Sequence, residues 1–412
     1  MEGGGDYEKL VNVYEVQARH SDDAGRKVEL LHRIASLHED VANNVERAFA
    51  TYARALAIEP LDETTVGGLD RLARTSGRFT ELADVYEELA ATQSDTELVA
   101  QLYSSAARVV QTDVGDVGRA INLFNKVLEV APRDLNAVEA LESLYATAER
   151  YAELSQILQR KSKVLEDLAE QKAALFEAAR IEEEVLQRPE AAIRVYESVL
   201  ELESEDLRAL DALIKLYLEL SRWEDLLAKQ REKVDLVQGS DDKKAIYYQM
   251  GAVYERELTN VPRAIDTYQK VLELDPDDLP ALGRLDVLYQ TAENWAELLT
   301  ILAHEAELTA DPAEAVSYQY RIAELYEKRL NDSDRAVELY RDVLNVQADH
   351  PPTLRALEGI KDSSGPRALL AAQALEPVYD AMAEWEKLVS ALSVQARFTE
   401  DPFHRVELLH RI

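Results

Sequence analysis

Apolar and polar residues follow the period of amphipathic α-helices along the chain, as the stretch from Lys243 to Pro276 shows. Within this stretch, apolar and small residues three and four positions apart fall on one stripe of each of two segments. The first segment carries Tyr247, Met250, Gly251 and Tyr254, and the second carries Ala264, Tyr268 and Val271. The pattern predicts two antiparallel helices that approach closely at their small residues, are joined by a tight turn and stop near Pro276.

The same pattern returns every 72 residues. The second helix of the pair repeats a small, an aromatic and an apolar position: Ala48, Ala120, Ala192, Ala264 and Ala336; Tyr52, Phe124, Tyr196, Tyr268 and Tyr340; Ala55, Val127, Val199, Val271 and Val343. The first helix repeats a small position: Ala35, Ala107, Ala179, Gly251 and Ala323. Chance does not produce five registered copies of four columns, so the chain is an array of repeated units.

Each unit of 72 residues has room for a second, degenerate helix pair. Its helices carry two leucine columns: Leu69, Leu141, Leu213, Leu285 and Leu357; Leu10, Leu82, Leu154, Leu226 and Leu298. A ring opens the second of these helices each time: Tyr7, Phe79, Tyr151, Trp223 and Trp295. We interpret these rings as core packing between stacked pairs, because aromatic residues at helical spacing usually fill cores.

The mix of aromatic, small and proline positions over a helix pair resembles the tetratricopeptide repeat (TPR), which is about 34 residues long. There are two departures: one extra residue lies between Tyr254 and Ala264, and Ser204 and Ala348 stand where prolines end the other second helices. The resemblance implies an all-α fold, a right-handed α-solenoid or superhelix of stacked antiparallel helix pairs.

The repeat pattern also suggests domain boundaries. We expect residues 1–6 to be a disordered start or a cloning remnant, and residues 7–361 to form the regular TPR-like solenoid of five units. Residues 362–384 break the period, and Ser364, Gly365 and Pro366 predict a turn before an additional helix. This insertion is either simply tolerated or a joint between two superhelical segments. Residues 385–412 repeat the start of the chain, so we expect a further unit that is truncated, in a fragment of a longer protein.

Composition narrows the classes of partner. The net charge is −33, from 79 acidic and 46 basic residues, which argues against binding nucleic acid or anionic membranes. The acidic excess either keeps helix faces soluble or attracts a basic partner. The chain has no cysteine, no apolar run long enough to insert into a membrane and no signal peptide at its start. These features favour a cytoplasmic location and leave the oligomeric state open.

The sequence offers no specific chemistry. His32 and His38 lie six positions apart, which does not place both on one helix face as a metal site would need. Neither a catalytic triad nor a glycine-rich phosphate loop is present. We therefore predict no catalytic residues, no metal and no cofactor, and we do not expect an enzyme.

The resemblance implies that the first helix of each pair lines the concave surface, where peptides or partner helices lie. The inward column contains His32, Ser104, Phe176, Tyr248 and Tyr320, and one turn further come Ser36, Arg108, Arg180, Ala252 and Glu324. Aromatic and arginine residues dominate binding hot spots, which gives the candidate partner-binding residues His32, Arg108, Phe176, Arg180, Tyr248 and Tyr320. The alternative is that these side chains only pad the inner wall. The family's carboxylate clamp for chaperone tails is not matched.

Three functions compete on the sequence alone. The first is a non-catalytic interaction scaffold or adaptor that binds partner peptides or helices on the concave surface. The second is the regulatory or substrate-recruiting array of a larger enzyme. The third is an acidic chaperone for a basic client, whose binding would collapse as salt rises.

Overall fold

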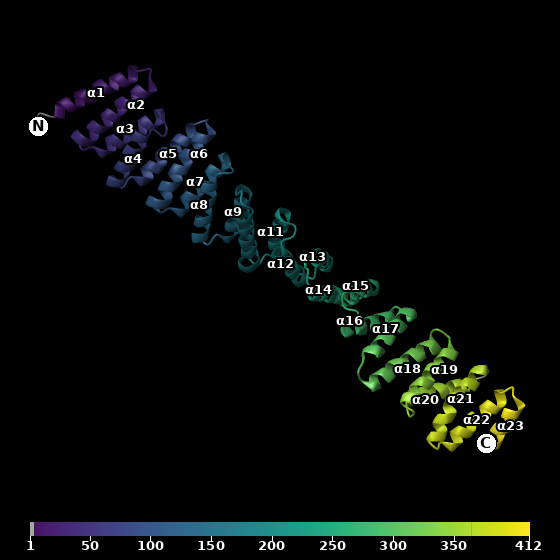
Figure 1. The fold of residues 1–412 in the computed structure, drawn as a ribbon. Helices are drawn as coiled ribbons and strands as arrows, with labels where there is room; N and C mark the ends of the chain where they lie inside the picture. Colours follow the sequence, from purple (N-terminus) through teal and green to yellow (C-terminus); the bar gives the residue numbers. More distant parts are fainter. Residues whose placement is uncertain (1–3, 364) are drawn as a thin grey trace. The chain divides into compact units, whose positions relative to one another are not determined.

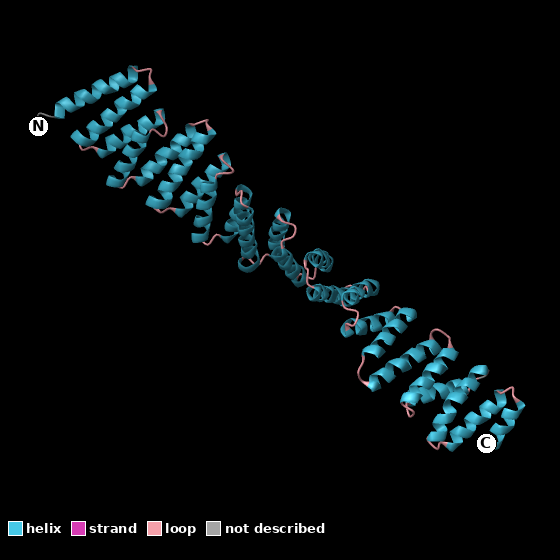
Figure 2. Ribbon diagram, viewed as in Figure 1, coloured by secondary structure: helices cyan, strands magenta, loops and turns pink. Residues whose placement is uncertain are grey.

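The computed structural model describes residues 4–363 and 365–412, which are almost wholly helical and contain no strand (Figure 2). The chain divides into two compact units, residues 1–216 and 217–412, and each is treated by itself below. Within each unit, consecutive helices lie side by side as a stack of helix pairs (Figure 1). The predicted all-α solenoid is confirmed.

The first unit is built from helices that match the predicted spans closely. They are α1 (Gly4–His20), α2 (Ala24–Ser36), α3 (Val45–Ile58), α4 (Glu63–Ser76), α5 (Phe79–Thr92), α6 (Thr96–Val109), α7 (Val117–Val130), α8 (Leu135–Thr147), α9 (Tyr151–Val164), α10 (Leu168–Arg180), α11 (Pro189–Leu202) and α12 (Leu207–Glu219), whose last residues belong to the second unit. Helix α1 begins at Gly4, and residues 1–3 lie outside the described residues, so the expectation of a disordered start or cloning remnant over residues 1–6 stays a prediction.

The second unit continues the same order of helices. They are α13 (Trp223–Leu236), α14 (Ser240–Ala252), α15 (Val261–Leu274), α16 (Leu279–Thr291), α17 (Trp295–Leu308), α18 (Pro312–Lys328), α19 (Ser333–Val346), α20 (Pro351–Lys361), α21 (Pro366–Ala381), α22 (Trp385–Phe398) and α23 (Pro402–Arg411).

The repeated columns form the core of each unit. The small residues of the second helices are fully buried, and each aromatic residue four positions later is at most 7% exposed. Gly251 allows the closest approach, because a Cβ at this position would lie 2.6 Å from the ring of Tyr268. Burial of these stripes against neighbouring helices stabilises the stack, since no repeat has a closed core of its own.

Side chains that accept hydrogen bonds, or prolines, begin the second helices. Asp116 accepts from the backbone N–H of Arg119, and Asp332 accepts from that of Arg335. Pro189 is the first residue of α11, and Pro262 lies in the first turn of α15. Helices α11 and α19 end without a following proline, because Glu203 and Gln347 already have extended backbones.

A wide turn follows the first helix of four pairs and accommodates the residue that exceeds the family norm. The π-helical turns are η1 (Leu37–Val41), η2 (Val110–Val114), η3 (Ile181–Val185) and η4 (Val253–Glu257). In η4 the N–H of Leu258 donates to the carbonyl of Val253, five residues earlier, at 3.0 Å. A left-handed residue then redirects the chain in every unit: Asn43, Gly115, Gln187, Thr259 and Asn331.

The predicted insertion contains one helix, α21, which packs against α19, α20 and α22. Its N-terminal cap, Gly365, has φ 119° and ψ −170°, a conformation that only glycine adopts easily. Pro366 occupies the first helical position, and Ser364 lies outside the described residues. A role for this segment as a joint stays a prediction.

Candidate partner-binding surface

The predicted inward rings lean on the aromatic column of the second helix. Their ring centroids lie 5.7 to 6.0 Å apart in the pairs His32–Tyr52, Phe176–Tyr196, Tyr248–Tyr268 and Tyr320–Tyr340. All four inward rings are half-buried. Such tilted ring pairs add to the stability of the helix pair, while a place on a concave wall and contact with a partner both stay predictions.

Three of the same rings contact the residue that precedes the helix two positions later in the stack. Helices α4, α8, α12, α16 and α20 start after one repeated position: Asp62, Asp134, Asp206, Asp278 and His350. The Tyr248 hydroxyl donates to Asp278, and His32 lies 3.4 Å from Asp62. The Tyr320 ring contacts His350 at 5.4 Å. These three rings therefore connect their own helices to the start of the helix two positions later in the stack.

In two repeats a lysine also contacts the aspartate at this helix start, and we call this set of ring and lysine contacts the closure of the repeat. Lys244 Nζ lies 2.7 Å from Asp275 and 3.2 Å from Asp278, and Lys172 Nζ lies 2.5 Å from Asp206 and also contacts Glu203. The hydrogen bonds that Lys244 donates to Asp275 and Asp278 raise its pKa. Burial opposes ionisation of Asp278, but hydrogen bonds from Tyr248 and a backbone N–H outweigh it and lower its pKa.

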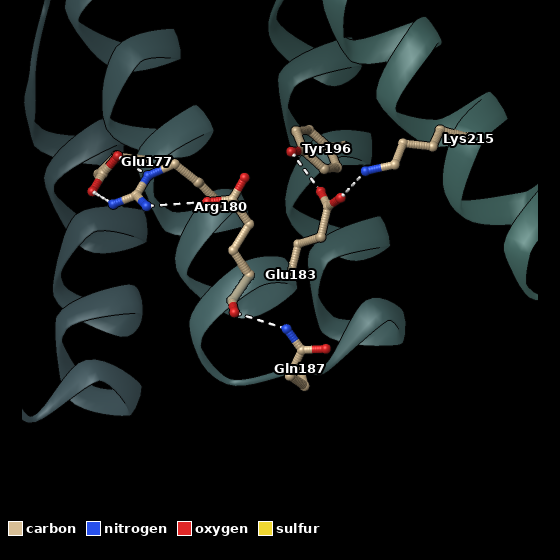
Figure 3. Close-up of polar contacts among 7 residues, drawn as sticks. Glu177, Arg180, Glu183, Gln187, Tyr196 and Lys215 are labelled. Atoms are coloured by element: carbon tan, nitrogen blue, oxygen red, sulfur yellow. Dashed lines mark hydrogen bonds and ion pairs between the residues drawn. The ribbon is translucent and has the colours of Figure 1, made fainter.

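The two candidate arginines differ in how their charge is neutralised. Arg180 donates to Glu177 at 2.6 Å and to Glu184 at 3.2 Å, so its guanidinium is held by its own helix and by η3 (Figure 3). These hydrogen bonds raise its pKa. Arg108 is exposed and donates only to the carbonyl of Ser104, at 3.4 Å, with no carboxylate partner in the described part of the chain.

Carboxylates on the π-helical turns hold the buried tyrosine hydroxyls. Glu183 accepts from Tyr196 at 3.1 Å and from Lys215 at 2.7 Å (Figure 3). Glu255, on η4, accepts from Tyr268 in the same way, and Glu327, in the last turn of α18, accepts from Tyr340. Burial, reinforced by the charge of Glu255, raises the pKa of Tyr268 to about 12.

The repeat formed by α6, α7 and α8 lacks this closure and contains a cleft of about 900 Å³. The inward position is Ser104 instead of a ring, and the position of Lys172 and Lys244 is Ala100. The cleft is lined by these two residues and by Arg108, Gln111, Phe124, Ala131, Asp134 and polar residues of α6 and α8. The sequence analysis named Arg108 but missed the cleft. Its signal was Ser104, the one member of the inward column without a ring.

The part of the chain that the structure describes holds neither a metal cluster nor a helix suited to span a membrane. Residues 4–363 and 365–412 contain no group of three or more histidine, aspartate or glutamate side chains arranged to hold a metal ion. No helix in these ranges combines the length and the apolar character needed to cross a membrane.

The repeated helix pairs and the surface of their first helices define a helical-repeat protein of the solenoid class. The family model described as tetratricopeptide repeat matches residues 245–278 and 317–349, which contain most of α14–α15 and α18–α19. These two stretches match the tetratricopeptide repeat, and the recurrence of the same columns along the chain supports the resemblance to this superfamily. No curated protein matches it in sequence.

Solved structures share the fold at low sequence identity. YrrB, titled "a TPR protein with an unusual peptide-binding site", is 17% identical over 50% of this chain and 96% of that chain, with TM-score 0.24. A tetratricopeptide repeat protein from Parabacteroides merdae ATCC 43184 is 16% identical over 63% and 98%, with TM-score 0.26. The human IFIT1 dimer with PPP-AAAA is 13% identical over 97% and 95%, with TM-score 0.29. At these values the matches concern the fold and carry no argument about function.

Proposed function

We propose that this chain is a non-catalytic interaction scaffold that binds peptide segments of partner proteins along the surface of its first helices. The observation that supports this most directly is the cleft at α6–α8, where the otherwise closed wall is open and Arg108 is unpaired. The lining of this cleft mixes polar side chains with apolar ones such as Phe124, so a bound peptide can make both hydrogen bonds and apolar contacts there. The half-buried rings of His32 and Phe176, which belong to the same unit, would frame this surface.

Photo-crosslinking tests this proposal without disturbing the rings. A benzoylphenylalanine residue would replace Gln101, which is exposed on α6 and lines the cleft, and Asn122, which is exposed on α7 and does not. The chain would then be irradiated with a mixture of random heptapeptides. We expect peptide adducts to form several-fold more often at position 101. Equal labelling at both positions would contradict the proposed surface.

The acidic composition supports a second candidate, a chaperone for a basic client. Acidic residues outnumber basic ones 79 to 46, so a net charge of −33 remains even if every basic residue pairs with an acidic one. Attraction by a diffuse field is screened within about 10 Å at 0.1 M salt. Binding of a lysine-rich polypeptide that vanishes between low and physiological salt, with no preference for position 101, would favour this candidate over the scaffold.

A further inference from the structure

The cleft of the α6–α8 repeat is defined by what its sister repeats contain at the same positions. In the α14–α16 repeat, Lys244 and Tyr248 fill this space and contact Asp278. In the α10–α12 repeat, Lys172 contacts Asp206, and the guanidinium of Arg208 lies 4.4 Å from the ring centre of Phe176. Intramolecular cations and rings therefore occupy this space elsewhere.

Four substitutions remove these groups together in the α6–α8 repeat. Ala100 stands at the position of Lys172 and Lys244, and Ser104 stands at the position of the ring. Ala131 stands at the position of the carboxylates Glu203 and Asp275, and Asn136 stands at the position of Arg208. All four residues line the cleft. The helices around it are unchanged in length and order, so the cleft is an emptied version of a site that its sisters keep filled.

The emptied site keeps the groups that receive a cation in the sister repeats. Asp134 is half-buried and accepts from the N–H of Ala137 at 2.9 Å, and no basic side chain among the described residues pairs with it. Phe124 is 4% exposed, and its ring borders the cleft where an inward ring covers its counterparts. The charged residues lining the cleft are Glu97, Asp134 and Arg108, two acids and one base.

We infer that this cleft receives one basic side chain, lysine or arginine, of a partner peptide, in the place that Lys244 and Tyr248 occupy in the α14–α16 repeat. The cation donates a charge-assisted hydrogen bond to Asp134, and its aliphatic stem makes an apolar contact along the Phe124 ring. The net charge of −33 draws basic segments toward the chain. This inference rests on the proposed function, because it specifies which peptides the scaffold binds.

The test begins with selection from a phage-displayed library of random heptapeptides on the immobilised chain. We expect the retained peptides to carry a lysine or arginine. Replacing that residue by glutamine in the synthetic peptide should weaken binding about tenfold or more in a calorimetric titration. Retained peptides without a basic residue would overturn the inference.

Grafting the sister residues closes the cleft. The double variant Ala100→Lys and Ser104→Tyr introduces side chains that the α14–α16 repeat already accommodates, so it should fold, which circular dichroism checks. We expect it to lose the selected peptides. Equal binding to both forms would overturn the inference and leave the proposed function in place, whereas failure of the library to yield any peptide would contradict both.

Two further variants separate charge from shape. Asp134→Asn keeps a residue that begins helices well but removes the carboxylate, and it should also weaken the selected peptides about tenfold. The reverse double variant, Lys244→Ala and Tyr248→Ser, opens the α14–α16 repeat and should add a second site for the same peptides. Unchanged affinity in Asp134→Asn would refute the assignment of a cation to this carboxylate.

Discussion

The α6–α8 and α14–α16 repeats share one backbone plan and differ in whether the space between the first helix and the next helix start is filled. In α14–α16, Tyr248 and Lys244 converge on Asp278. In α6–α8, Ser104 and Ala100 leave Asp134 facing a cleft of about 900 Å³.

This difference teaches how a solenoid separates stability from binding. Each repeat is stabilised mainly by its neighbours, so the core columns must stay constant while inward positions can change one repeat at a time. In the filled repeats, the aromatic and basic side chains make contacts within the repeat. A binding site can then arise by deleting side chains rather than by adding them.

The largest expected effect comes from truncating the core ring of each repeat. Tyr268→Ala removes a ring that is 2% exposed and covered by Tyr248, and should destabilise its repeat by about 4 kcal/mol. Phe124→Ala should cost about 1 kcal/mol less, because water from the open cleft can enter the space it leaves. Native-state hydrogen exchange, read separately on α14–α16 and α6–α8, measures both values. Equal losses would show that the cleft does not relieve the cavity.

A second contrast concerns the helix that precedes each first helix. Leu89 on α5 is an apolar residue 8% exposed, whereas its counterpart three units later is Glu305 on α17, which is 5% exposed. One carboxylate oxygen of Glu305 has no hydrogen-bond partner in the described part of the chain. Burial, together with the nearby charge of Asp286 and against that of Arg321, raises the pKa of Glu305 to about 7.

The pH dependence of stability tests this buried carboxyl. Since the folded state holds the proton more tightly than the unfolded chain, stability from this group is present below pH 4.5 and is lost as pH rises through 7. Glu305→Leu, the residue type of the α5 position, should raise the free energy of unfolding at pH 8 by about 2 kcal/mol and leave it nearly unchanged at pH 4. Hydrogen exchange of α17 and α18 at the two pH values measures this. Glu305→Gln serves as the control of similar shape, and an equal effect of Glu305→Leu at both pH values would contradict the titration.

Sequence alone predicted the helices because the same apolar columns recur, and local errors average out over repeats. It also detected the extra residue between Tyr254 and Ala264, but not the π-helical turn that accommodates it, because that turn depends on backbone hydrogen bonds such as Leu258 to Val253. The right-handed sense of the superhelix and the role of the 362–384 insertion remain predictions.

The candidate site was predicted less completely. The inward column identified Tyr248 and Phe176, but their contacts with the next helix start join residues about 30 positions apart, which helix periodicity does not reveal. The pairing of Arg180 with Glu177 and Glu184 could be predicted from the sequence, because these glutamates lie three and four positions away on the same helical face. Comparison of the columns for exceptions, rather than for matches, would have found Ser104.

The smallest expected effect concerns the hydroxyl that distinguishes Tyr248 from Phe176. Tyr248→Phe keeps the ring contact with Tyr268 and removes one hydrogen bond to Asp278, so it should cost the α14–α16 repeat about 1 kcal/mol at pH 7. Because that bond lowers the pKa of Asp278, its stabilisation is present above the ordinary carboxyl range and is lost as pH falls through the lowered pKa.

The variant should therefore differ from the parent at pH 7 and approach it at an acid pH below the lowered pKa, where Asp278 is protonated in both. Urea titrations followed by hydrogen exchange in α16 measure the difference, and Phe176→Tyr in the sister repeat supplies the matched reverse change. A cost that is the same at both pH values would mean that the hydroxyl acts by filling space rather than by its bond to the carboxylate. The filled repeats would then be closed by shape, and the comparison with the open cleft at Ser104 would rest on volume rather than on charge.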